Sequence, residues 1–71
     1  MYWFSPEGTS EVFFLTYKQF TQINELFENE TGTHVIFAED KKGHKKQLDF
    51  FNNYFHSLTD TELLSFKKIT L

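Results

Sequence analysis

The chain has 71 residues, which is enough for one domain, and its lack of cysteine excludes disulfides and thiolate metal sites. The formal net charge of the whole chain is −3, which argues against a nucleic-acid-binding protein. No apolar run approaches the roughly 20 residues that span a bilayer. The first residues lack the basic and apolar regions of a secretion signal. We therefore expect a single compact cytoplasmic domain over residues 1–71 with no membrane contact.

Aromatic side chains are abundant: the chain holds ten phenylalanines, three tyrosines and one tryptophan. One such ring buries about 150–250 Å², whereas a domain of this size hides only about 60% of the surface of its unfolded chain. The interior therefore cannot hold every ring. We expect the remaining rings to form a contiguous apolar patch, a feature that usually marks a partner site.

Two short strands are predicted at the start of the chain. Met1–Phe4 is aromatic and suits an edge strand, and the turn-forming residues Ser5–Ser10 follow it. Glu11–Leu15 is short, apolar and β-branched or aromatic, which is typical of a buried strand.

A helix is predicted over Tyr17–Glu30. Thr16 can cap its first turn, and Gln19 three residues later completes a capping box. Gly32 can end the helix, because glycine adopts the left-handed conformation common at helix C-termini. Apolar residues recur every three or four positions, which places them on one face: Tyr17, Phe20, Ile23 and Phe27.

The middle of the chain predicts a β-hairpin. Thr33–Glu39 has the composition of a strand, and the turn Asp40–Gly43 ends in a glycine that suits a bulged hairpin turn. His44–Leu48 is then the return strand, with lysines that would protect an exposed edge.

Two more helices are predicted at the end. Asp49 can cap a helix over Phe50–Leu58, and Thr59 with Glu62 forms a second capping box. The last short helix then presents Leu63, Phe66 and Ile69 at intervals of three. The predicted order is β-β-α-β-β-α-α, an α+β fold whose small antiparallel sheet of three or four strands is packed on one face by two or three helices.

Catalytic and metal-binding motifs are not found in the sequence. Gly8, Gly32 and Gly43 are too far apart to form a phosphate loop, and no serine lies in a nucleophile elbow. The three histidines lack the spacing of a zinc site. We therefore expect a protein that is not an enzyme and holds no metal or cofactor.

The favoured function is a small non-enzymatic protein-binding regulator or inhibitor. Composition rich in Phe, Lys, Asn and Ile and free of Arg indicates an AT-rich gene, such as one from a phage or another mobile element. Residues 1–40 hold seven of the ten carboxylates and residues 41–71 hold six of the seven lysines, an asymmetry that would orient a partner. The predicted interface has aromatic anchors and an acidic rim: Tyr2, Trp3, Phe4, Phe50 and Tyr54, with Glu25 and Glu28.

Two alternatives remain open. One is a nucleic-acid-binding module in which the lysine hairpin Lys41–Lys46 contacts phosphates through Lys41, Lys42, Lys45 and Lys46. The other is a self-associating structural protein, in which a second copy, as a homodimer, covers the surplus rings.

Overall fold

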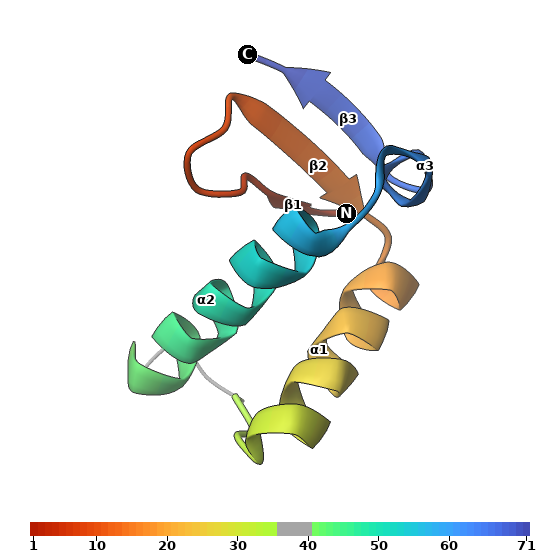
Figure 1. The fold of residues 1–71 in the computed structure, drawn as a ribbon. Coiled ribbons are helices and arrows are strands. Elements are labelled where there is room, and N and C mark those ends of the chain that lie inside the picture. Colours follow the sequence, from red (N-terminus) through yellow and green to blue (C-terminus); the bar gives the residue numbers. More distant parts are fainter. Residues whose placement is uncertain (36–40) are drawn as a thin grey trace.

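The computed structural model describes residues 1–35 and 41–71. Six elements follow one another in this part of the chain (Figure 1): β1 (Tyr2–Phe4), β2 (Glu11–Leu15), α1 (Tyr17–Thr31), α2 (Lys41–Ser57), α3 (Asp60–Leu63) and β3 (Lys67–Thr70). The observed order is β-β-α-α-α-β, so the α+β class is confirmed and the predicted order of elements is wrong.

The three strands form one antiparallel sheet in the order β1-β2-β3. Trp3 lies opposite Phe14 in the β1–β2 pair, and Ile69 lies opposite Val12 in the β2–β3 pair. Strand β2 is central, and the strand from the far end of the chain completes the sheet. β1 and β3 are its two edges among the described residues.

Helix α1 begins at the predicted residue, Tyr17, and ends at Thr31, one residue beyond the predicted end. The Thr16 hydroxyl accepts the Gln19 N–H at 3.1 Å, and the Gln19 side chain accepts the Thr16 N–H at 2.9 Å, so both halves of the capping box form. Gly32 follows the helix at φ 68°, in the left-handed region, and its N–H donates to the Glu28 carbonyl. The local signals at both ends therefore fix the length of this helix.

Helices α1 and α2 lie side by side in opposite directions (Figure 1). The Gln47 side-chain amide donates a hydrogen bond to the Asn24 side-chain oxygen, and Phe27 packs on Phe50. Both cover the same face of the sheet, where side chains from three elements form the core: Phe13, Leu15, Ile23, Phe51 and Phe55. Full burial of such a side chain contributes about 1.5–3 kcal/mol. Aromatic rings of the strands and helices contact one another through this core. The ring centroid of Phe55 lies 5.1 Å from that of Phe13 and 5.3 Å from that of Phe4.

The predicted hairpin return strand is wrong. His44–Leu48 belongs to α2, with Gly43 in its first turn and Asp49 inside it rather than at its start. A glycine inside a helix costs at most about 1 kcal/mol, and burial of Phe51 and Phe55 from the same helix outweighs that cost. Of the predicted strand Thr33–Glu39, residues 33–35 form no strand and the rest lie outside the described residues.

The predicted last helix is also too long. Thr59 and Glu62 do form their capping box, but α3 ends at Leu63 and Ile69 lies in β3. The Glu62 and Leu63 carbonyls accept the N–H groups of Ser65 and Phe66 in a turn, after which the chain extends. Pairing with β2 supplies a hydrogen-bond ladder that helical spacing alone does not reveal. No helix in the described ranges, 1–35 and 41–71, has the length and apolar character to cross a membrane.

Candidate protein-binding surface

The central strand β2 is apolar on both of its faces. Phe13 and Leu15 point into the core and are 2% and 1% exposed. Val12 and Phe14 alternate with them and therefore point to the opposite face. A strand that is apolar on both faces is typical of a sheet that is covered on both sides, yet the two long helices cover only one.

The uncovered side of the sheet, which we call the open face, carries a row of apolar side chains. Trp3 stands beside Phe14 and is 66% exposed, and Ile69 stands beside Val12 and is 44% exposed. Lys67, opposite Phe14 on β3, adds a cation to this face. The open face is thus Trp3, Val12, Phe14, Ile69 and Lys67.

A second apolar surface lies along the outer edge of β1. Tyr2 projects to the helix side of the sheet, where its ring stacks on Phe20 at 4.5 Å and lies 6.1 Å from Tyr17. A groove of about 130 Å³ lies between β1 and the helices, with Phe20 and Leu48 among its walls. Tyr17 and Leu48 are 68% and 54% exposed. We call this surface the aromatic edge: Tyr2, Trp3, Tyr17, Phe20 and Leu48.

The two edges of the sheet differ in charge. β3 carries Lys67 and Lys68, and lysines on an edge strand discourage pairing with another chain. The Lys68 ammonium lies 2.8 Å from a carboxylate oxygen of Glu11, and this hydrogen bond raises the pKa of Lys68. β1 consists of Tyr2, Trp3 and Phe4 and bears no charge.

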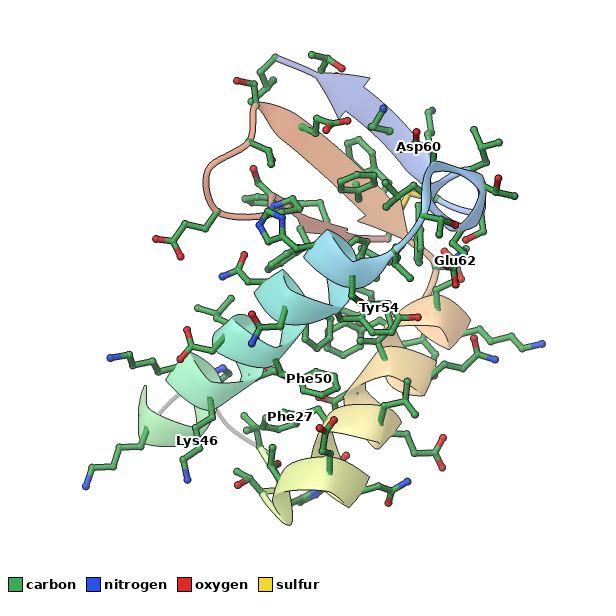
Figure 2. The ribbon with its side chains drawn as sticks, in the orientation of Figure 1. Phe27, Lys46, Phe50, Tyr54, Asp60 and Glu62 are labelled. Atoms are coloured by element: carbon green, nitrogen blue, oxygen red, sulfur yellow. The ribbon has the colours of Figure 1, made fainter. Side chains whose placement is uncertain are left out.

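A further groove of about 460 Å³ lies between α1, α2 and α3. Tyr54 reaches from α2 toward α1, and Glu62 lies at the α3 end (Figure 2). Phe50 faces α1 and packs on Phe27 at 5.6 Å (Figure 2), so it serves the helix–helix contact. Both predicted anchors of α2 are half-buried, and they lie in grooves that do not include Tyr2 or Trp3.

The predicted acidic rim lies on α1. Glu25 is exposed. Glu28 is half-buried, accepts the Asn24 amide at 3.0 Å and contacts the ring of His34. In the part of the chain that the structure describes, neither carboxylate is among the residues that line the three grooves holding Tyr2, Trp3, Phe50 and Tyr54.

The lysine cluster lies in the first turns of α2 rather than at a hairpin tip. Lys42, Lys45 and Lys46 are exposed, and Lys46 points away from the sheet (Figure 2). Lys41 opens the helix, whose first turn holds no acidic residue. Lysines at a helix N-terminus add to the positive end of the helix dipole, so this end of α2 favours anions.

Histidines and carboxylates do not gather into a metal centre in residues 1–35 and 41–71, where no group of three or more potential ligands converges. His56 instead joins two elements: its Nε2 lies 3.0 Å from the Glu7 carbonyl oxygen and links α2 to the turn between β1 and β2.

Three apolar residues of the open face, Val12, Phe14 and Ile69, were not among the predicted interface residues. The sequence signal for Val12 and Phe14 is the strand Glu11–Leu15 itself, which lacks the apolar–polar alternation of a sheet with one solvent-exposed face. Ile69 could not be found in this way, because its helical spacing hid the strand.

In comparisons with known proteins, no family model, no curated protein and no solved structure matches this chain.

Proposed function

We propose that this chain is a small non-enzymatic protein-binding regulator or inhibitor that docks on its partner through the open face. One observation carries the proposal: β2 is apolar on both faces, and the helices of the described chain bury only the side with Phe13 and Leu15.

The composition of the open face suits a protein partner. Trp3 is the kind of side chain that dominates binding energy, and Phe14 beside it is half-buried at the centre of the row. Apolar residues at the centre with a charge at the margin match the usual layout of protein interfaces. The partner surface we propose is apolar and carries a carboxylate that faces Lys67.

Such a chain would act by occupying a surface of its partner. The open face lies on a sheet held from behind by the core, so the exposed side chains are already positioned before binding. Pre-organisation of this kind lowers the entropic cost of association. Occupation of a partner surface is the simplest mechanism for a regulator or inhibitor of this size.

Site-specific photo-cross-linking tests the proposal. A benzophenone amino acid replaces Phe14 on the open face or, as the matched control, exposed Asn53 on α2. In extract from the source cells, we expect position 14 but not position 53 to give an adduct with one defined polypeptide. Lys67→Glu should weaken capture, and more so at low salt, because it reverses the charge that faces the partner. Equal adducts from both positions, or no adduct from position 14, would contradict the proposal.

A second candidate function rests on the lysines of α2. We propose as this alternative that Lys42, Lys45 and Lys46, with the positive end of the helix dipole, contact the phosphates of a nucleic acid. It ranks second because Glu25, Glu28 and Glu30 lie on the adjoining half of α1 and would repel a polyanion. A salt titration with a labelled duplex tests it: affinity must fall steeply as salt rises, and binding that is absent or insensitive to salt excludes it.

A further inference from the structure

We infer that two copies of this chain pair through strand β1, antiparallel about a two-fold axis, to form one continuous sheet in the order β3-β2-β1-β1-β2-β3. The inference deepens the proposed function, because such a dimer would set two open faces side by side. It stands on a different observation, the uncharged outer edge of the sheet.

The charge difference between the two edges selects β1. Two β3 strands brought together would gather Lys67 and Lys68 from each copy, and like charges across a strand pair oppose pairing. Two β1 strands bring together only Tyr2, Trp3 and Phe4. No ionised side chain of the strand has to be neutralised or desolvated when β1 meets its own copy.

The shape of β1 favours a symmetric pair. Antiparallel strands of three residues overlap fully in a single register, with Trp3 opposite the second copy's tryptophan and Tyr2 opposite its Phe4. Trp3 faces the open side of the sheet, so the two indoles would adjoin on that side. Aromatic pairs that face each other across neighbouring strands stabilise a sheet.

The exposed apolar area next to β1 sets how strong a dimer can be. Tyr2, Trp3 and Tyr17 are 42%, 66% and 68% exposed, and at about 150–250 Å² for each ring they leave roughly 350 Å² in water. Leu48, 54% exposed beside the groove, adds to this area together with the strand backbone. Stable interfaces bury about 600–1,000 Å² on each partner. The ring area of the aromatic edge lies below that range, which predicts a weak, reversible dimer that forms only as concentration rises.

Sedimentation equilibrium of the full chain tests the inference, with the emission of Trp3 as a second readout. Trp3 is the single tryptophan, so its fluorescence reports on the proposed axis without any substitution. We expect a monomer–dimer equilibrium, and over the same concentration range a blue shift and reduced acrylamide quenching of Trp3. A monomer up to about 1 mM, or dimerisation that leaves the Trp3 emission unchanged, overturns the inference.

Two matched variants separate edge pairing from stacking of open faces. Trp3→Lys and Ile69→Lys each place a charge at an exposed position of the open face, on β1 and on β3 respectively. Edge pairing predicts that Trp3→Lys weakens the dimer at least tenfold, while Ile69→Lys changes its dissociation constant less than twofold. An equal or larger effect of Ile69→Lys would show that the faces stack, and edge pairing would be wrong.

If the chain stays monomeric but position 14 still cross-links specifically to a partner, the dimer is excluded and the proposed function stands. If the chain dimerises but position 14 gives no specific adduct, the dimer stands and the proposed function is wrong.

Discussion

Trp3 and Phe14 lie directly opposite each other on neighbouring strands, and both point away from the helices. The residues next to them in the sequence, Phe4 and Phe13, form the adjacent pair of the register and point into the core. Aromatic side chains thus occupy both sides of the β1–β2 ladder. One side stabilises the fold, and the other is the surface that we assign to binding.

The two sides of β2 should respond differently to truncation. Phe13→Ala removes a ring that is 2% exposed and contacts Phe55 and Phe66, so we expect a loss of about 3–5 kcal/mol in the free energy of unfolding. Phe14→Ala removes a half-buried ring of the open face and should cost about 1 kcal/mol. Urea unfolding followed by circular dichroism measures both. Equal losses would mean that Phe14 is as well covered in the isolated chain as Phe13.

The capping box of α1 should be needed for full stability. Thr16→Ala removes the hydroxyl that accepts the Gln19 N–H, and we expect a loss of about 0.5–2 kcal/mol in the free energy of unfolding. Thr16→Ser keeps the oxygen and serves as the control, with most of the stability retained. If serine were as destabilising as alanine, the hydroxyl would not be the group that matters.

The sequence predicts elements well where the signal is local. Helix α1 was found because Thr16, Gln19 and Gly32 mark its ends within a few residues of chain. The short strands β1 and β2 were found because the turn cluster Ser5–Ser10 separates them. These signals act between near neighbours, and tertiary contacts do not contradict them.

The sequence fails where distant contacts decide. Gly43 and the flanking lysines are typical of a turn, but the core that receives Phe51 and Phe55 keeps the whole segment helical. Ile69 has helical spacing from Phe66, yet it pairs with Val12, far away in the chain. Propensity is a weak guide in both places because packing overrides it.

For the candidate site, the surplus of aromatic rings was the informative signal. Three of the thirteen described rings, Tyr2, Trp3 and Tyr17, are exposed, and Tyr2 contacts Tyr17. The placement of Phe50 and Tyr54 in other grooves depends on how α2 is rotated against α1, which a helical wheel of one helix does not determine.

Gly32 should be needed for its backbone conformation alone. Its φ of +68° is strained for a side chain, and a Cβ there would meet nothing within 4 Å. Gly32→Ala is therefore expected to lower the free energy of unfolding by about 1 kcal/mol, and Gly32→Asn by less, because asparagine tolerates this conformation better. Thermal and urea unfolding of the two variants give the comparison. An alanine variant as stable as the parent would show that the helix end relaxes without cost.

The cap of α3 should make stability depend on pH in the acid range. A Glu62 carboxylate oxygen accepts the Thr59 N–H at 2.9 Å and the Thr59 hydroxyl at 3.0 Å, and the backbone hydrogen bond is the main cause of the lowered pKa of Glu62. A carboxyl whose pKa is lower in the folded state stabilises the fold above its unfolded pKa, and this contribution is lost as pH falls through the folded value, below 4.5.

The variant Glu62→Gln keeps an oxygen acceptor but cannot titrate. We therefore expect the parent to be more stable than Glu62→Gln near pH 7, with the difference shrinking toward zero at about pH 2. Urea midpoints of both proteins at the two pH values measure that difference, and a difference that does not change with pH would show that ionised Glu62 does not support the cap.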